Sequence, residues 1–286
     1  MGAVSRPDPQ LPGRPERLSP LVQRVLAPNA SPYTFTGTQT HLVGAPGTAM
    51  AVIDPGPADD VHLDALLTAA GSGGVAAILV THNHRDHSPG AAPLAARTGA
   101  PVIGCAPLEA GPAFDRDYAP DRVLADGEGI DGEGWTLTAL ATPGHTSNHL
   151  CFVLAEEAAL FSGDHVMGWS TTVILPPDGS MGAYLASMER LLARDDRVFY
   201  PAHGDPIADP RRAVRSQLGH RRFREAQLLR QLEAGAVALD PLVAALYASL
   251  DPRLRGAAAA TVLAHLIDLG ERGLVLEEGG EWRLAR

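Results

Sequence analysis

The sequence predicts an α+β fold in which helices cover β-sheets, followed by a small C-terminal unit. Three observations support this prediction. Over most of the chain, β-prone segments alternate with segments of helical periodicity, a pattern typical of sheets covered by helices. Residues 75–80 form a continuous apolar run suited to a strand buried on both faces. From Leu239 onwards, two helical patterns precede a hairpin, which is typical of a winged-helix-like unit.

The composition indicates a globular protein. At 286 residues and 45% hydrophobic content, the chain can bury one main core and a small appended domain. No apolar stretch approaches the ~20 residues that cross a bilayer, and the first twenty residues lack the apolar segment of a signal peptide. We therefore expect a cytoplasmic protein with no membrane partner. Cys105 and Cys151 are too few for a disulfide framework and are expected to be reduced.

The first elements lead to a strand in the middle of the predicted sheet. Residues 1–30 are rich in Pro and Arg without a period, so we expect a loosely ordered lead-in. Residues 33–43 and 49–53 are β-prone runs joined by a Gly- and Pro-containing turn, which predicts a hairpin. Residues 59–70 carry apolar residues at helical spacing and stop at a Gly-rich segment, after which the buried strand 75–80 begins.

The remaining elements continue the alternation. A helix and a strand are expected at 90–97 and 101–104, and a loop-like stretch at 106–134; strands follow at 135–140, 149–154 and 158–162, a helix at 183–193, a strand at 197–200, a polar helix at 209–234, helices at 241–250 and 257–269, and a hairpin at 274–284. These elements define four segments: the lead-in 1–30, a main domain 31–208, an Arg-rich connecting helix 209–235, and a winged-helix-like domain 236–286.

A cluster of metal-binding side chains follows the buried strand directly. His82, His84, Asp86 and His87 lie within six positions, a density that no ordinary folding role explains. Imidazole and carboxylate donors without a thiolate favour Zn²⁺, with iron or manganese as alternatives. Because the cluster begins where the strand ends, a rigid scaffold presents it at a sheet edge.

Three further candidate ligands occupy equivalent places later in the chain. His145, Asp164 and His203 each lie in a Gly- or Pro-containing turn just after a predicted strand. Strand ends of this kind hold side chains rigidly at one edge of a fold. The sequence therefore predicts a composite metal site built from four segments.

These seven residues resemble the motif set of the metallo-β-lactamase superfamily, with HxHxDH at residues 82–87 and the later single ligands in order. The resemblance covers roughly residues 33–208 and implies a four-layer αββα sandwich with two divalent metal ions per chain at its edge. It implies that the first metal is held by His82, His84 and His145, the second by Asp86, His87 and His203, and that Asp164 bridges them.

Such a centre implies hydrolysis. Two divalent ions about 3.5 to 4 Å apart lower the pKa of a shared water toward ~7 and stabilise charge on the attacked oxygen. Asp86 is the candidate catalytic residue, because it can accept a hydrogen bond from that water as well as bind metal. Asp54, in the turn ahead of the cluster, is expected to support the histidine loop from behind.

Five other residues are candidates for substrate contact. His149 lies four positions after His145, and Thr171 and Thr172 lie in the loop after Asp164. Arg221 and Arg224 belong to a segment with seven arginines in twenty positions. We expect these arginines to bind an anionic group on the substrate, although an Arg-rich helix is also typical of a solvated surface.

A closer resemblance links the chain to the β-lactamase-like protein 2 branch, through the motifs at 142–146, 162–165, 168–172, 200–204 and 219–225 and the C-terminal winged-helix-like unit. That branch implies endoribonuclease activity on single-stranded RNA in an animal member and less defined hydrolase activity in bacterial ones. A net charge of −10 and an aromatic content of 5% argue against RNA, because phosphate binding and base stacking need basic and aromatic side chains.

We therefore expect a small ester or thioester substrate with an anionic handle such as a phosphopantetheine group, as in the related hydroxyacylglutathione hydrolases. Single-stranded RNA cleavage is the first alternative. The others are a diiron redox or metal-sensing module, which lacks the usual flavin domain here, and a β-lactamase, which lacks a secretion signal here. The C-terminal unit could cover the cleft or form the surface of a homodimer.

Overall fold

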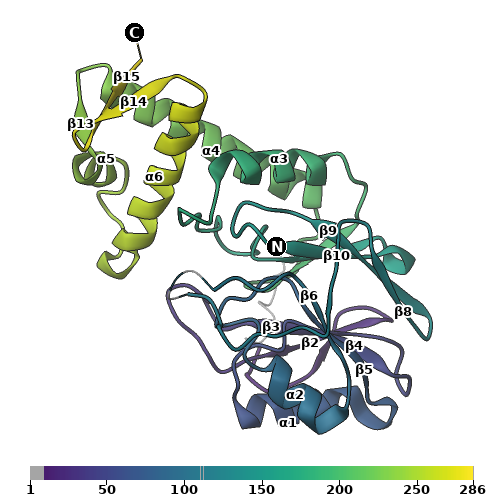
Figure 1. Cartoon of the computed structure of the whole chain (residues 1–286). Coiled ribbons are helices and arrows are strands. Elements are labelled where there is room, and N and C mark those ends of the chain that lie inside the picture. The colour runs from purple at the N-terminus through teal and green to yellow at the C-terminus, as the bar shows by residue number, and fades with distance from the viewer. Residues whose placement is uncertain (1–9, 110, 112, 286) are drawn as a thin grey trace, which may run out of the picture.

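Two β-sheets form the centre of the larger part of the molecule (Figure 1). The computed structural model describes residues 10–109, 111 and 113–285. The first sheet has seven strands in the order β1-β2-β3-β4-β5-β6-β7. Their bounds are Glu16–Arg17 (β1), Val22–Leu26 (β2), Gln39–Val43 (β3), Met50–Ile53 (β4), Val75–Val80 (β5), Val102–Gly104 (β6) and Arg122–Val123 (β7).

The second sheet packs face to face on the first. It has five strands in the order β12-β11-β10-β9-β8. Val52 and Ile78 of the first sheet share one hydrophobic cluster with Phe152 and Phe161 of the second. The bounds are Gly129–Gly132 (β8), Trp135–Ala141 (β9), Leu150–Leu154 (β10), Ala159–Gly163 (β11) and Val198–Pro201 (β12). Strands β7 and β8 lie within 106–134, so the expectation that this whole stretch is loop-like was wrong.

Helices cover the outer faces of both sheets. Helices α1 and α2 lie against the first sheet, and α3 and α4 lie against the second (Figure 1). Tyr184 of α3 and Val214 of α4 pack on Leu160 and Phe199 of the second sheet. The layers therefore follow the order α, β, β, α, which confirms the predicted sandwich. The bounds are Asp60–Ala70 (α1), Ala91–Thr98 (α2), Met181–Leu192 (α3) and Pro210–Leu232 (α4), with short 3-10 helices at Gly71–Gly73 (η1) and Ala155–Glu157 (η2).

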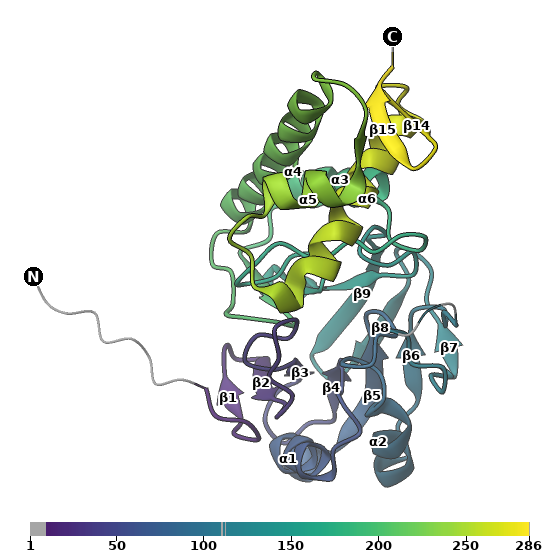
Figure 2. The ribbon, with the colours of Figure 1, turned by 90° about the vertical axis from the view of Figure 1, so that its left-hand side faces the viewer.

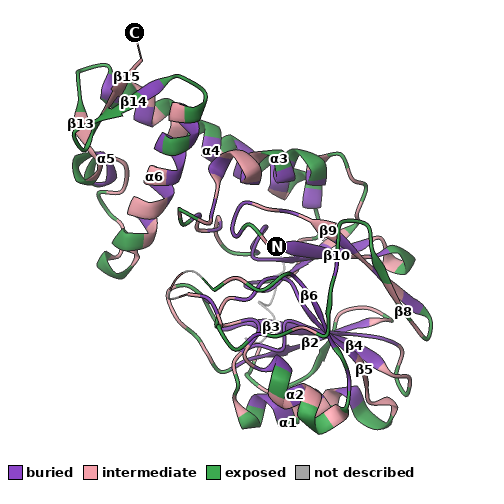
Figure 3. Ribbon diagram, in the orientation of Figure 1, coloured by how far each residue is buried: buried purple, intermediate pink, exposed green. Residues whose placement is uncertain are grey.

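The segment that leads into the predicted metal site folds as its sequence indicates. Asp59 caps α1 by accepting a hydrogen bond from the backbone N–H of His62. Leu63 and Leu66 bury the inner face of this helix. Gly71 ends it at a φ of 63°, which glycine adopts without steric cost. Strand β5 then lies between two parallel neighbours, and the strands of this sheet form the buried interior seen in Figure 3.

Strand direction places the predicted ligands at one edge. Strands β4, β5 and β6 run parallel, as do β11 and β12. The segments after β5, β11 and β12 leave the carboxyl ends of parallel strands, where side chains from separate segments meet in open α/β sheets. The antiparallel strands β9 and β10 return through a connection that contains His145.

The expectation of a loosely ordered lead-in over 1–30 was wrong from Glu16 onwards. Strand β2 pairs antiparallel with β3, and all five of its residues are buried. Val22 and Val25 belong to the main core, while the buried guanidinium of Arg24 forms a salt bridge of 2.8 Å with Glu16. A strand with a polar, paired face has no apolar period to reveal it. Residues 1–9 lie outside the described residues.

The C-terminal unit is a winged helix, as predicted (Figure 2). Its core combines Leu242, Val262 and Leu266 with Leu228 and Leu232 from the end of α4. Its elements are β13 (Val237–Ala238), α5 (Leu239–Leu246), η3 (Pro252–Leu254), α6 (Arg255–Glu271), β14 (Val275–Glu278) and β15 (Glu281–Leu284). Strands β14 and β15 pair antiparallel around the Gly279-Gly280 turn.

Helix α4 joins the two units. Val214 and Leu218 near its start pack in the core of the second sheet, and Leu228 and Leu232 near its end pack in the core of the winged helix. The boundaries at 31, 209 and 236 stay predictions. Among the described residues, no helix is long and apolar enough to span a membrane.

Candidate metal centre

Four separate segments bring the seven predicted ligands together. The loop after β5 supplies His82, His84, Asp86 and His87, and the other three follow β9, β11 and β12. Their ligand atoms form three groups, within each of which the atoms lie no more than 4.8 Å apart. The groups are His82, His84 and His145; His82, His87 and Asp164; and Asp86, His87 and His203.

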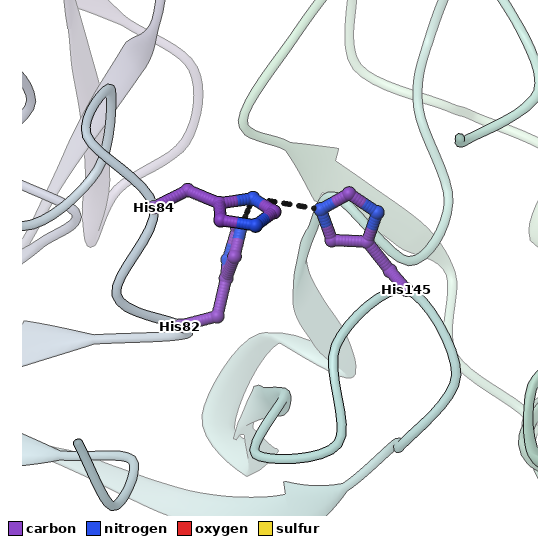
Figure 4. Close-up of side chains that lie close together, drawn as sticks. All are labelled: His82, His84 and His145. Atoms are coloured by element: carbon purple, nitrogen blue, oxygen red, sulfur yellow. Dashed lines mark hydrogen bonds between the residues drawn. The ribbon is translucent and has the colours of Figure 1, made fainter. Parts of the chain in front are cut away.

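The first group is a set of three imidazoles whose rings point at a common position (Figure 4). Nδ1 of His84 lies 3.0 Å from Nε2 of His82 and 3.1 Å from Nε2 of His145. Three nitrogen atoms at these separations suit one tetrahedral metal ion whose fourth position is open.

The second group combines one carboxylate with two imidazoles. Oδ2 of Asp86 lies 3.2 Å from Nε2 of His203 and 3.6 Å from Nε2 of His87. Asp164 lies between the two groups: its Oδ1 atom is 3.3 Å from Nε2 of His203, and its Oδ2 atom is 3.7 Å from Nε2 of His145. One carboxylate thus presents an oxygen to each group.

Unsatisfied buried atoms show that these residues fit a cation. Nε2 of His87, Nε2 of His203 and Oδ1 of Asp164 are buried without a hydrogen-bond partner in the described part of the chain. Leaving such atoms unpaired is costly, so a native fold normally provides a partner. A divalent cation at the convergence point would satisfy all three.

The opposite ring nitrogens are fixed from outside the site. Nδ1 of His145 donates to the carbonyl of Val173 at 2.7 Å, and Nδ1 of His203 lies 3.3 Å from the carbonyl of Gly37. Such outer hydrogen bonds set the tautomer and orientation of metal-binding imidazoles. Nε2 of both rings is then free to accept a metal.

Asp54 has the supporting position that its sequence context predicts. Its Oδ1 accepts a hydrogen bond from the backbone N–H of Thr81 at 2.8 Å, and its Oδ2 accepts one from the Thr81 hydroxyl at 2.8 Å. The same Oδ2 lies 3.0 Å from Nδ1 of His87. One buried carboxylate therefore fixes both the start and the end of the histidine loop.

Protonation states agree with metal binding. Burial lowers the pKa of His84 to about 3 and places the pKa of His82 well below its usual value. Both rings are neutral at pH 7 and present the lone pairs that a metal requires. Burial alone would raise the pKa of Asp164, but the adjacent His203 and His87 outweigh it and lower that pKa well below its usual range. The bridging position thus carries a negative charge.

Asp86 faces the solvent side of the centre. Its side chain is 28% exposed, and it lines a cavity of about 420 Å³ together with His84, His145 and Asp164. Burial favours the protonated form of Asp86, but His87 and His203 outweigh this effect and lower its pKa. An ionised carboxylate at the cavity surface can accept a hydrogen bond from a nucleophilic water.

The structure contradicts the expected substrate role of His149. The residue is 1% exposed and lies behind His82, with the two ring centroids 5.1 Å apart. Its Nδ1 atom lies 2.9 Å from the hydroxyl of Thr142, and its Nε2 atom accepts a hydrogen bond from the backbone N–H of Asp164. With both nitrogens bonded inside the protein, His149 supports the ligand loops and does not face the cavity.

The other four substrate candidates separate into two sets. Thr172 lines the cavity beside the metal centre, and Thr171 and Arg221 line a second cavity next to it. Arg224 was a wrong prediction: its guanidinium lies 4.4 Å from the centroid of the Tyr247 ring and donates to the carbonyl of Leu246, so it joins α4 to the winged helix.

Several cavity residues were not found from the sequence. Tyr33, Met167 and Leu175 supply much of the apolar lining beside the metal centre. Each lies in a loop without periodicity, so no pattern marked it in advance. The exposed aromatic side chains of Tyr33 and Trp169 are the signal that comes closest, because exposed aromatic residues commonly mark binding sites.

Comparison with known proteins agrees with this geometry. Residues 33–203 match the family described as the Metallo-beta-lactamase superfamily. The chain belongs to this superfamily. Residues 239–282 match the Beta-lactamase associated winged helix domain, so this superfamily member carries the appended domain that its topology shows. Its centre is accordingly that of a metallo-beta-lactamase superfamily hydrolase, with donors for divalent metal.

Two curated relatives and one solved structure illustrate the likeness. A lactamase-like protein of Pestalotiopsis microspora is 33% identical over 240 residues, covering 83% of this chain and 71% of the relative. An atrochrysone carboxyl ACP thioesterase of Claviceps purpurea is 31% identical over 262 residues, covering 86% and 78%. A metallo-beta-lactamase family protein from Thermus thermophilus superposes with a TM-score of 0.76 at 25% identity, covering 94% of this chain and 100% of that one.

Proposed function

We propose that this protein is a dinuclear metal-dependent thioesterase that hydrolyses an acyl thioester carried on a pantetheine-type thiol. The carrying observation is the convergence of seven metal-binding side chains beside a cavity of about 420 Å³ with a largely apolar lining. The Claviceps relative, named as a thioesterase acting on a carrier-protein substrate, supports the thioester in place of an ordinary ester.

The chain's own residues divide the work. His82, His84 and His145 would hold one ion, Asp86, His87 and His203 the other, and Asp164 would contact both. When bound, two divalent ions supply a hydroxide at neutral pH and stabilise the charge that develops on the thioester oxygen. Asp86 orients the nucleophilic water by accepting its hydrogen bond at the cavity surface.

The surroundings of the cavity favour an acyl group. Tyr33, Met167 and Leu175 offer apolar contact to a hydrocarbon or aromatic acyl chain. A thiolate leaving group needs little protonation because its pKa is far below that of an alcohol. The chain therefore needs no general acid as strong as an ester or amide would require.

The same surroundings argue against RNA. Several arginines of α4 are occupied: Arg211 pairs with Asp195 at 3.0 Å, Arg222 pairs with Glu189 at 2.8 Å, and Arg224 bonds the winged helix. RNA binding requires a continuous basic track beside stacking aromatic side chains. The net charge of −10 weakens any encounter with phosphates further.

Zinc is the metal we propose. The donors are six side chains with imidazole or carboxylate groups around Asp164, and none is a thiolate. Elemental analysis of purified protein tests this assignment. About two zinc ions per chain support the hydrolase, whereas two irons would favour a diiron redox module.

The decisive experiment is a parallel assay of zinc-loaded protein on a panel of acyl pantetheine and acyl coenzyme A thioesters, labelled single-stranded RNA and a chromogenic lactam. We expect metal-dependent release of free thiol from the thioesters, abolished by chelation and restored by zinc. His84→Ala serves as the inactive control, because it removes a nitrogen from the first group. Cleavage of RNA or lactam without thioester hydrolysis would reject the proposed substrate.

A further inference from the structure

A second cavity lies next to the catalytic one, between the main domain and the winged helix. It has a volume of about 130 Å³. Both cavities are lined by Tyr33, Met167, Thr172 and Val173, so one wall of the metal cleft continues into the second cavity. Helix α6 and the segment before it close the far side. A substrate bound at the metals can therefore extend toward the winged helix.

One charged side chain lines this second cavity, and that side chain is Arg221. The residue is 2% exposed and lies on α4 with its guanidinium carbon 5.1 Å from the centroid of the Tyr184 ring. One of its terminal nitrogens donates to the carbonyl of Thr172 at 2.5 Å. The remaining lining, which includes Leu250, Leu254 and Trp169, is mainly apolar or weakly polar.

Arg221 lacks the partner that a buried cation normally has. In the described part of the chain it forms no salt bridge, and its Nε–H has no hydrogen-bond partner. Its sequence neighbour Arg222 is exposed and paired with Glu189. A buried charge without a counter-ion is costly. The planar guanidinium binds carboxylates and phosphates through paired hydrogen bonds, so an anion is the ligand that completes this site.

We propose that the second cavity is a subsite for an anionic group, a carboxylate or a phosphate, on the substrate whose thioester lies at the metals. This inference rests on the proposed function and extends it. The acyl or thiol part of the substrate follows the wall formed by Thr172 and Val173, and its anionic end meets Arg221. The apolar lining selects a substrate whose anion terminates a hydrocarbon or planar body.

Binding without hydrolysis tests the subsite directly. Trp169 lines the cavity, so its fluorescence should change when benzoate or phenyl phosphate binds and should not change with benzyl alcohol. Trp169→Phe assigns the signal. Arg221→Met should weaken anion binding by about tenfold or more, which corresponds to at least ~1.4 kcal/mol. The full chain is measured with zinc bound and again after chelation, because the metals themselves attract anions.

Two further variants separate binding from folding. Arg222→Met removes an equally close but exposed charge and should leave anion binding unchanged. Ala257→Asp places a carboxylate in the cavity lining while Arg221 stays in place, and it should also abolish anion binding. If anions bind equally well to Arg221→Met, Ala257→Asp and the unchanged protein, the subsite is rejected.

Kinetics identify which end of the substrate carries the anion. We compare a dicarboxylic half-thioester of N-acetylcysteamine with a neutral acyl group on phosphopantetheine. Arg221→Met should raise KM about tenfold for the compound whose anion enters the cavity and leave KM for a neutral acyl N-acetylcysteamine thioester unchanged. Arg221-dependent anion binding without thioester hydrolysis would reject the proposed function alone. Hydrolysis with no effect of Arg221→Met on either readout would reject the subsite alone.

Discussion

Oδ2 of Asp54 lies 3.0 Å from Nδ1 of His87, so a carboxylate 33 residues upstream fixes the ring of a residue in the metal centre. Asp54 has a φ of 52°, in the left-handed region that non-glycine residues seldom adopt. Strained backbone of this kind persists where the surrounding structure fixes it, and it clusters at functional sites. Here the strain aims the carboxylate at both Thr81 and His87.

Asp54→Asn should weaken metal binding by about 10- to 100-fold, the usual effect of losing an outer partner of a metal-binding histidine. The amide keeps the size of the side chain but removes the charge that orients the His87 ring. Competition with a chromophoric chelator measures the affinity. Asp60→Asn, on the exposed start of α1, is the matched control and should bind metal normally. Equal affinities for both variants would contradict the supporting role.

Asp164→Ala should release metal and abolish hydrolysis, because this carboxylate presents one oxygen to each half of the centre. Elemental analysis and the thioester assay together measure the effect. Asp195→Ala removes an exposed carboxylate and should retain both metal and activity. Full activity of Asp164→Ala with unchanged metal content would overturn the ligand assignment.

Gly144→Ala should disturb the turn that carries His145. Gly144 has a φ of 145°, and an added Cβ would lie 2.3 Å from the Cα of Tyr184. Because α3 backbone cannot yield that far, the turn must move, with a loss of at least about 1 kcal/mol in the free energy of unfolding and a lower metal affinity. Gly219→Ala, where an added Cβ meets no atom within 4 Å, is the control and should unfold at or above the original temperature. A Gly144→Ala protein with unchanged unfolding and metal binding would show that the close approach is dispensable.

The sequence predicted the metal centre well because chemistry and topology coincide there. His82 follows a buried parallel strand, and Asp164 and His203 follow two others, so strand ends alone placed them near one another. The Asp54 support was also predictable, since a Pro-Gly turn holds it just ahead of the cluster. Local patterns suffice when each functional side chain is tied to the end of a regular element.

Substrate residues were harder to predict for a physical reason. His149 and Arg224 have the right residue types, but the direction of each side chain depends on packing that no period encodes. His149 turns inward to bond Asp164, and Arg224 turns toward Tyr247. Strand β2 was missed in the same way, because the pairing of Arg24 with Glu16 hides a polar side chain inside the fold.

His265→Leu should make the protein more resistant to acid. His265 is buried in α6, and neither of its ring nitrogens has a hydrogen-bond partner in the described part of the chain. Burial, together with the nearby charge of Arg221, lowers the pKa of His265 from 6.5 to about 3. The folded protein therefore binds fewer protons than the unfolded chain between these values. Stability that is present above pH 6.5 is lost as the pH falls toward 3.

Between pH 7 and pH 5 this single residue should cost about 2 kcal/mol in the free energy of unfolding, a loss that His265→Leu avoids. Urea unfolding of both proteins at the two pH values, in the presence of excess zinc, measures the difference. His265→Asn is the matched variant: it removes the titration but keeps a polar group, so its pH dependence should match that of His265→Leu while its stability at pH 7 stays lower. If all three proteins lose the same free energy on acidification, His265 stays neutral in both folded and unfolded chains and does not set the acid limit of this fold.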